Sequence, residues 1–265
     1  MKGLKYGTGN FLWFLTICMG MMYVQTRAQG NVLSVSGAID RDSTALKFKY
    51  KAVVVPAVMI GYGLVATESH TLMTINGGIK EEINEHIDEK FTIDDISQYS
   101  PALAVYGLNL SGIHGRHDFK DRTVILATAY AIMGASVFGL KTVMRVKRPD
   151  GTTRNSFPSG HTATAFMGAE FLWQEYKYRS VWYGIAGYAV AAGTGFFRIY
   201  NDRHWFSDVV AGAGIGILST KIAYWIHPLF QKKAGKEVAE EKRYDSTFFP
   251  FYNGREAGVG IVIRF

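Results

Sequence analysis

Uncharged apolar runs of helical length recur along the chain and alternate with polar, charged segments. The runs are Ala52 to Thr67, Thr123 to Leu140, Ser180 to Phe197 and Val209 to Thr220, with a shorter run from Thr162 to Trp173. Alanine and glycine recur within them, which favours close approach of neighbouring helices. The pattern predicts an all-α helical bundle, with Pro56 kinking the first helix.

Length decides whether these helices cross a bilayer, because a spanning helix needs about 20 apolar residues and about 17 is near the lower limit. Thr123 to Leu140 and Ser180 to Phe197 qualify narrowly. If each run crosses once, the basic loop Lys177 to Arg179 lies opposite the polar blocks 141–161 and 198–208, as the positive-inside rule requires. We therefore predict a multi-pass inner-membrane protein with those blocks facing the periplasm. The short runs leave a soluble exported bundle as the alternative.

The two ends of the chain differ from this helical region. Residues 1–28 join a basic start to an apolar stretch and a small-x-small triplet, which predicts a signal peptide or an uncleaved signal anchor. At the other end, Asn253-Gly254 between apolar runs predicts a β-hairpin tail. We predict four segments: the signal at 1–28, a helix with amphipathic connecting helices at 29–122, the functional core at 123–228, and a basic linker with the hairpin at 229–265.

Charge narrows the class of partner. The formal net charge is +7, and basic residues cluster near the polar blocks and at the ends of apolar runs. No basic stripe interleaves with exposed aromatic residues, so an anionic substrate or a membrane surface is favoured over nucleic acid. Cys18, the only cysteine, lies in the signal segment, which excludes an internal disulfide. Nothing in the sequence indicates an oligomeric state.

The first polar block reads KTVMRVKRP and places Lys141 and Arg148 seven residues apart. A helix that continued through both would carry them on one face until Pro149 ended it. Two cations on one face repel each other unless an anion lies between them. Taken alone, the block is better explained as a basic helix end at a membrane surface.

The second block, SFPSGH, precedes an apolar run and predicts a turn that enters a helix. The backbone N–H groups of Ser159, Gly160 and His161 would then point at an anion, assisted by the helix dipole. The Ser159 hydroxyl would add a donor, and His161 could protonate a leaving alkoxide. The alternative is an ordinary serine N-cap with an incidental histidine.

The third block reads RIYNDRHWFSD, in which His204 and Asp208 are four residues apart and would meet on one helical face. The carboxylate would fix the tautomer of the imidazole and leave its other nitrogen free to act as a nucleophile. Arg198 would supply a fork of donors for phosphate oxygens. A structural His–Asp pair at a helix start is the alternative.

Together, in this order and spacing, the blocks resemble the type 2 phosphatidic acid phosphatase and vanadium haloperoxidase superfamily. The signature of that family is Lys-x6-Arg-Pro, then Pro-Ser-Gly-His, then Ser-Arg-x5-His-x3-Asp. The resemblance covers about residues 123–228, and every ionisable position of the signature is present. One position departs from it, because Phe197 stands where the family usually has serine.

The resemblance implies an all-helical core and a metal-free, two-step phosphate transfer that needs no cofactor. His204, oriented by Asp208, would attack phosphorus, and His161 would protonate the leaving oxygen and then activate water. The implied phosphate-binding residues are Lys141, Arg148, Ser159, Gly160 and Arg198. This assignment requires that both imidazoles meet at one site. It also requires that no internal carboxylate permanently occupies the cationic cradle, the space between Lys141, Arg148 and Arg198.

The apolar helices favour a lipid substrate among the phosphate esters. The candidates are phosphatidylglycerophosphate, phosphatidate, undecaprenyl pyrophosphate and a phosphate of lipid A. A soluble periplasmic acid phosphatase is the main alternative, and a vanadate-dependent haloperoxidase is a further one. We expect His114 and His117, in HGRHD, to lie in an exposed loop without a metal.

Overall fold

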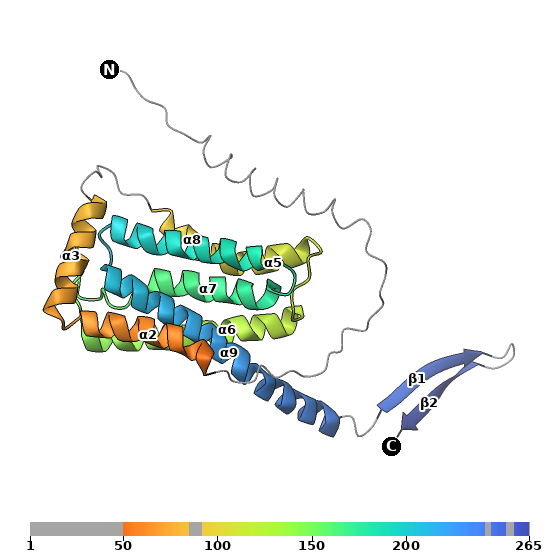
Figure 1. The fold of residues 1–265 in the computed structure, drawn as a ribbon. Coiled ribbons are helices and arrows are strands. Elements are labelled where there is room, and N and C mark those ends of the chain that lie inside the picture. The colour runs from red at the N-terminus through yellow and green to blue at the C-terminus, as the bar shows by residue number, and fades with distance from the viewer. Residues whose placement is uncertain (1–49, 85–91, 242–244, 253–256, 265) are drawn as a thin grey trace, which may run out of the picture. The chain divides into compact units, whose positions relative to one another are not determined.

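The computed structural model describes residues 50–84, 92–241, 245–252 and 257–264. The predicted signal at 1–28 and the Asn253-Gly254 turn lie outside these residues. Figure 1 shows the elements in order. They are α2 (Lys51–Ala66), α3 (His70–Asn84), α4 (Asp94–Ser97), α5 (Ser100–Leu110), α6 (Phe119–Met144), α7 (Gly160–Tyr176), α8 (Val181–Tyr200), α9 (Phe206–Glu241), β1 (Asp245–Tyr252) and β2 (Ala257–Arg264).

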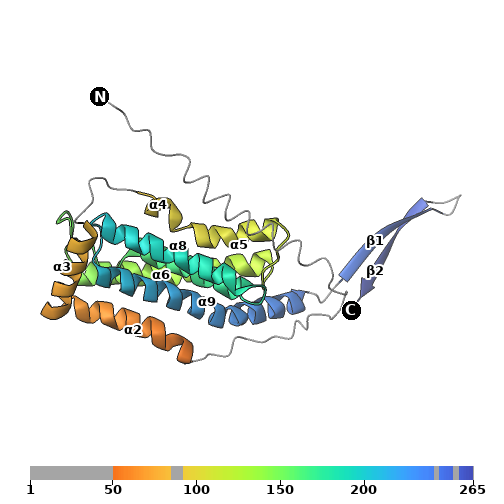
Figure 2. The same ribbon diagram turned by 45° about the horizontal axis from the view of Figure 1, so that its top comes forward.

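Helix α7 forms the centre of the bundle. Nearly all its residues are buried, and it contacts α5, α6, α8 and α9. Figure 1 shows α7 running between α8 and α9, and Figure 2 shows α2 packed along α9. The all-α prediction is therefore confirmed for the described helical region.

Small residues let α9 approach α7 closely. A Cβ atom at Gly216 would lie 2.2 Å from the backbone oxygen of Ala163, and one at Gly212 would lie 2.4 Å from that of Ser159. No side chain larger than hydrogen fits at either position without a backbone shift. The two glycines lie four residues apart on one face of α9, the spacing that membrane helices use for close contact.

Two described helical segments, Phe119–Met144 and Phe206–Phe230, are long and apolar enough to cross a membrane. A third span is possible if α2 and α3, which meet at a bend of 97°, are counted as one. The sequence predicted two runs of barely sufficient length, Thr123 to Leu140 and Ser180 to Phe197. The first of them lies within Phe119–Met144. Large apolar side chains, among them Val124, Phe138 and Val143, are exposed on α6, as lipid contact requires.

The helix boundaries differ from the sequence prediction in two places. Helix α6 ends at Met144 because Arg145 adopts a left-handed backbone conformation with φ of 46°. Lys141 and Arg148 therefore do not share a helix face, and the prediction of a continuing helix is wrong. Residues 70–84, which the sequence left as part of a connecting segment, form the additional helix α3.

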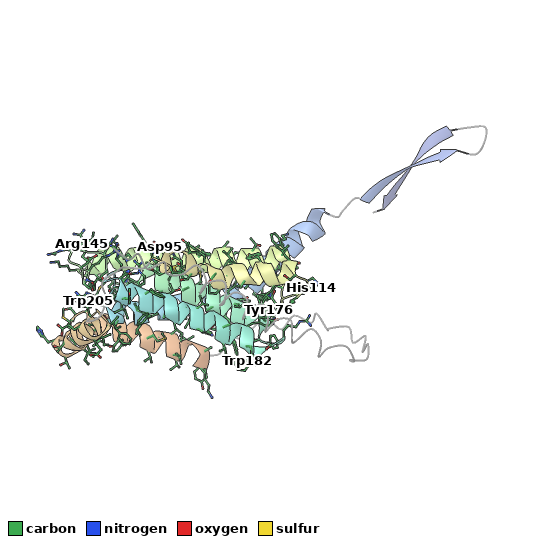
Figure 3. All side chains as sticks on the ribbon, turned by 90° about the horizontal axis from the view of Figure 1, so that it is seen from above. Asp95, His114, Arg145, Tyr176, Trp182 and Trp205 are labelled. Atoms are coloured by element: carbon green, nitrogen blue, oxygen red, sulfur yellow. The ribbon has the colours of Figure 1, made fainter. Side chains whose placement is uncertain are left out.

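The HGRHD segment is less exposed than predicted. His117 Nδ1 lies 2.7 Å from Oε1 of the buried Glu175, whose Oε1 also accepts a 2.6 Å hydrogen bond from the Tyr224 hydroxyl. The Arg122 guanidinium lies 3.7 Å from the same carboxylate. This network belongs to the end of the bundle where Figure 3 labels His114 and Tyr176.

Strands β1 and β2 pair antiparallel, from Asp245 opposite Arg264 to Tyr252 opposite Ala257. Among the described residues these are the two strands, and both follow α9 in the sequence.

We predict that Gly216→Ala destabilises the bundle. The added methyl group would overlap the α7 backbone, and overpacking of this kind costs about 1–3 kcal/mol, more than the roughly 1 kcal/mol by which alanine is favoured over glycine in a helix. The thermal unfolding midpoint in detergent, followed by circular dichroism, should fall. Gly134→Ala in α6 is the matched control, because nothing lies within 4 Å of its added Cβ, and its midpoint should be unchanged or higher. An unaltered midpoint for Gly216→Ala would contradict the close α7–α9 packing.

Candidate active site

The three polar blocks lie at one end of the bundle. Lys141 is in the last turn of α6, His161 is in the first turn of α7, and Arg198 is in the last turn of α8. His204 lies in the short turn before α9, and Asp208 lies in the first turn of that helix. Figure 3 labels Arg145, Asp95 and Trp205 at this end, opposite Tyr176 and Trp182. Successive antiparallel helices explain the convergence, since each block occupies a helix end on the same side.

Hydrogen bonds join the second and third blocks. The Ser159 N–H donates to the Asp208 carbonyl oxygen over 3.0 Å, and the Ser156 hydroxyl donates to the Asp208 carboxylate. The N–H groups of Arg203 and His204 donate to the Arg198 carbonyl oxygen over 3.0 and 3.2 Å. The turn that carries His204 is thus held to both α7 and α8.

His204 and Asp208 form a buried pair. The His204 Nδ1 atom lies 3.6 Å from Asp208 Oδ2, and the two side chains are 2% and 0% exposed. This separation is longer than a hydrogen bond, although catalytic contacts often tighten only when substrate binds. His204 precedes α9, so the prediction that His204 and Asp208 share a helical face is wrong. The two side chains are nevertheless close to each other.

Burial keeps His204 neutral. Removal from water is the largest cause that lowers the pKa of His204 to about 4; the charges of Lys141 and Arg198 act in the same direction, and Asp208 opposes them. An unprotonated imidazole is the form that can attack phosphorus. The side chain therefore has the protonation state of a nucleophile at neutral pH.

The electrostatic coupling places both imidazoles beside the same cation. Burial is the largest cause of the lowered pKa of Arg148, His161 and His204, and in each case the positive charge of Arg198 lowers the pKa further. Each of these three groups therefore lies near Arg198. The two rings are therefore on the same side of the molecule.

Asn155 holds the two cations of the first block. Its carbonyl oxygen accepts from Lys141 Nζ, and its side-chain oxygen accepts from Arg148 Nε over 2.9 Å. Both contacts use neutral oxygens, so the positive charges of Lys141 and Arg148 remain available to an anion. Sequence reasoning missed Asn155 because nothing in the loop pattern marks it.

Arg198 already has an internal carboxylate partner. Its NH1 group donates to Asp94, which is 1% exposed and also accepts a 3.1 Å hydrogen bond from Asn201 Nδ2. The expectation that the cradle holds no internal carboxylate is therefore wrong for this side chain. Arg198 Nε is buried and has no hydrogen-bond partner among the described residues.

His161 also contacts a carboxylate. Its Nε2 atom lies 2.8 Å from Asp95 Oδ1, and Asp95 is 58% exposed. Asp94 and Asp95 lie in the segment that the sequence treated as a connection, and the adjacent acidic pair was the only signal that could have drawn attention to it. Ligand atoms of Asp94, Asp95 and His161 lie within 4.8 Å of one another, but Arg198 already neutralises Asp94 and we assign no metal there.

The turn at the start of α7 fits the prediction in part. Ser159 is the N-cap, fully buried, and its hydroxyl accepts from the Thr162 N–H. Because its own N–H donates to Asp208, Ser159 cannot present that N–H to an anion as predicted. At Gly160, a Cβ would meet only Val137 at 3.7 Å, so the turn does not require glycine for internal packing.

Helix α3 supports the third block from outside. Asn76 makes two hydrogen bonds with Ser207, donating to its hydroxyl over 2.8 Å and accepting from its N–H over 3.1 Å. Lys80 donates to the Pro149 carbonyl oxygen over 3.1 Å and pairs with Asp202 at 3.4 Å.

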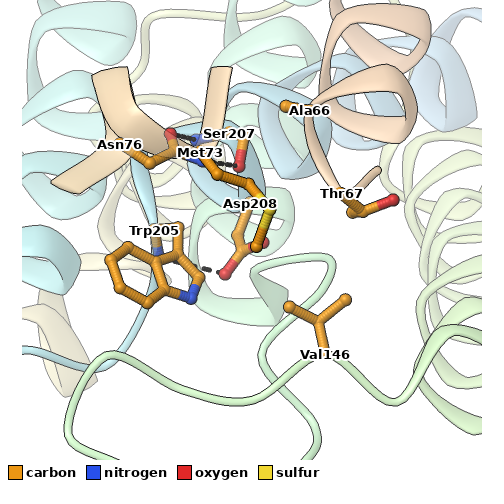
Figure 4. A pocket seen from close by; sticks show the side chains of 8 residues that line it. All are labelled: Ala66, Thr67, Met73, Asn76, Val146, Trp205, Ser207 and Asp208. Carbon is orange, nitrogen blue, oxygen red and sulfur yellow. Dashed lines mark hydrogen bonds between the residues drawn. The ribbon is translucent and has the colours of Figure 1, made fainter. Parts of the chain in front are cut away.

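A pocket of about 60 Å³ lies between these contacts and the bend of α2 and α3 (Figure 4). Its lining consists of Ala66, Thr67, Met73, Asn76, Val146, Trp205, Ser207 and Asp208. Neither histidine of the site lines it, so we do not assign it to a substrate phosphate.

Part of the chain is similar to known proteins. Residues 122–232 match the sequence model of the PAP2 superfamily. A lipid A 1-phosphatase from Porphyromonas gingivalis is 43% identical over 157 residues, which cover 58% of this chain and 35% of that protein. The bacitracin transport permease protein BcrC of Bacillus licheniformis is 35% identical over 74 residues, which cover 28% of this chain and 34% of that protein. The chain thus spans about a third of the length of the curated relatives it matches.

Two solved structures are similar at lower identity. Aquifex aeolicus LpxE has 24% identity and a TM-score of 0.43, covering 56% of this chain and 94% of that one. A PAP2-type phosphatidylglycerolphosphate phosphatase from Bacillus subtilis has 17% identity and a TM-score of 0.41, covering 68% of this chain and 96% of that one. The segment that matches the PAP2 superfamily, residues 122–232, includes all three polar blocks.

Proposed function

We propose that this protein is a metal-independent phosphatase that hydrolyses lipid phosphate esters through a phosphohistidine on His204. The observation that carries the proposal is a buried, neutral imidazole near Lys141 and Arg198, at the end of an apolar bundle that also holds Arg148 and a second imidazole. A cationic site binds the phosphoryl group, and two histidines divide the nucleophilic and proton-transfer roles.

In the first step, His204 Nε2 attacks phosphorus while the bond from phosphorus to the ester oxygen breaks. Asp208 stabilises the positive charge that develops on the ring. His161 donates its proton to the leaving oxygen, so that the alcohol departs neutral. Lys141, Arg148 and Arg198 bind the non-bridging oxygens as charge shifts among them, and loss of one such preorganised donor typically costs about 100- to 1,000-fold in rate.

In the second step, His161 is the base. It removes a proton from water, the water oxygen attacks phosphorus, and the bond from phosphorus to His204 breaks. Inorganic phosphate leaves, His204 returns to its neutral form, and His161 regains the proton needed for the next cycle. No oxidant, cofactor or metal takes part.

Two observations favour a lipid substrate. The relative from Porphyromonas gingivalis, 43% identical over its matched segment, is a lipid A 1-phosphatase, so a lipid A phosphate is the first substrate to test. The end of α6 that carries Lys141 also exposes Phe138 and Val143, which would bring the site to a membrane surface. Phosphatidate, phosphatidylglycerophosphate and undecaprenyl pyrophosphate are the further candidates, with the site at the periplasmic face of the inner membrane.

We predict that His204→Ala abolishes release of phosphate from lipid phosphates, with a loss of roughly a thousandfold or more, because no other group replaces the nucleophile. His161→Ala should lose about 100- to 10,000-fold with a lipid ester, whose alkoxide needs a proton. With an aryl phosphate, whose leaving group needs none, the His161 variant should accumulate phosphoenzyme, measured by acid quench and radiolabel.

His117→Ala is the matched control for these variants, since this histidine contacts Glu175 in the last turn of α7, whereas His161 is in the first turn of that helix. Its phosphate release per folded protein should stay near that of the wild type, and a chelator should not change the rate. Full phosphate release by His204→Ala would end the mechanistic assignment.

We predict an acidic optimum for kcat/KM. His204 is neutral above its pKa of about 4, whereas His161 must start protonated. Burial, together with Arg198, lowers the pKa of His161 below its ordinary value of 6.5, although Asp95 opposes the change. The rate should therefore fall as pH rises through the pKa of His161 and fall again as pH drops toward 4. A profile still rising above pH 8 would contradict these roles.

We predict that the protein remains with the inner membrane after osmotic shock and needs detergent for extraction, because Phe119–Met144 and Phe206–Phe230 are long enough to span. Immunoblots of the shock fluid and of the membrane pellet test this directly. Release without detergent would favour the soluble periplasmic phosphatase instead.

A further inference from the structure

Asp95 contacts two groups that the proposed mechanism needs. Its Oδ1 atom lies 2.8 Å from Nε2 of His161, the proposed proton donor, and 3.7 Å from NH1 of Arg198, a proposed phosphate ligand. A single carboxylate oxygen thus bridges the group that serves the leaving oxygen and a group that binds the phosphoryl oxygens.

Asp94 and Asp95 are adjacent but occupy different environments. Asp94 is 1% exposed and is fixed by Arg198 and by Asn201, so it acts as a permanent support for the guanidinium. Asp95 is 58% exposed, which places its charge where the site opens to solvent. The entrance therefore carries a negative charge beside the proton donor, although the interior is cationic.

We propose that Asp95 selects the leaving group, favouring phosphate monoesters of uncharged alcohols or sugars and disfavouring diphosphates. The inference rests on the proposed function, because it uses His161 as the residue that faces the leaving oxygen. Whatever follows that oxygen in the substrate must pass close to Asp95.

Charge explains the discrimination. In a diphosphate, His204 attacks the terminal phosphorus, the bond to the bridging oxygen breaks, and that oxygen departs with an anionic lipid monophosphate. Two like charges about 4–6 Å apart near a protein surface repel strongly enough to change a rate about tenfold or more. A neutral alcohol or sugar experiences no such repulsion and can donate a hydroxyl to the carboxylate.

Acid catalysis favours the same substrates. An alkoxide is a poor leaving group and needs the proton of His161, whereas a phosphate leaves without one. A carboxylate next to His161 stabilises the protonated ring, which is the form that an ester requires. Asp95 thus assists the reaction of esters and opposes the binding of diphosphates.

The test compares two substrates with one hydrocarbon chain, farnesyl monophosphate and farnesyl diphosphate, in detergent micelles. Initial kcat/KM values for the first phosphate released are measured for the wild type and for Asp95→Asn. The ratio of diphosphate to monophosphate should rise about tenfold in the variant. Asp94→Asn is the matched control: it removes the partner of Arg198 and should slow both substrates while leaving their ratio within about twofold.

Binding gives a second measurement that does not depend on turnover. Inorganic pyrophosphate would place its second phosphate near Asp95, whereas orthophosphate would not. The inhibition constant of pyrophosphate, relative to that of orthophosphate, should fall about tenfold in Asp95→Asn.

An unchanged ratio in either measurement would overturn the inference, as would an equal loss on both substrates, because Asp95 would then only position His161. These results leave the proposed phosphatase standing. If the wild-type protein releases phosphate from no lipid ester or diphosphate, the proposed function fails, and the inference fails with it.

Discussion

The contact between α7 and α9 sets the geometry of the candidate site. Glycine at positions 212 and 216 lets the α9 backbone lie against Ser159 and Ala163, at a separation that any Cβ would prevent. This approach brings the Ser159 N–H to the Asp208 carbonyl oxygen and so ties the turn before α7 to the start of α9. The two histidines belong to different blocks, and this helix contact holds those blocks together.

Charge is the second constraint on the site. Lys141, Arg148 and Arg198 lie close enough to affect one another, and such a cluster is unfavourable until an anion arrives. The fold reduces the electrostatic repulsion among these cations in two ways. Asn155 holds two of the cations with neutral oxygens, and Asp94 neutralises part of the third. The positive charge of these three side chains is thus partly compensated within the fold.

Much of this arrangement could be predicted from the sequence. Apolar runs indicated the helices, and the order of the three blocks indicated which side chains would meet, because both signals are local or depend on family resemblance. The boundary of α6 could not be predicted in this way. It depends on the left-handed backbone of Arg145, which the sequence KTVMRVKRP does not reveal.

Contacts between residues far apart in the sequence could not be predicted either. Asp94 meets Arg198 across 104 residues, and Asn76 meets Ser207 across 131. No periodic pattern links such positions, and a DD or NG dipeptide in a polar segment is most often a solvated loop. Their roles follow only from the packing of α3 and α4 against the end of the bundle.

The partners that α3 and α4 supply lie outside the segment that matches the PAP2 superfamily, residues 122–232. A chain trimmed to that segment would keep every signature residue and yet lose the carboxylate of Asp94 and the amide of Asn76. The buried guanidinium of Arg198 would then carry an uncompensated charge, which proteins tolerate poorly. Helices α3 and α4 therefore contribute to the candidate site, although they lie outside the segment that carries its sequence motif.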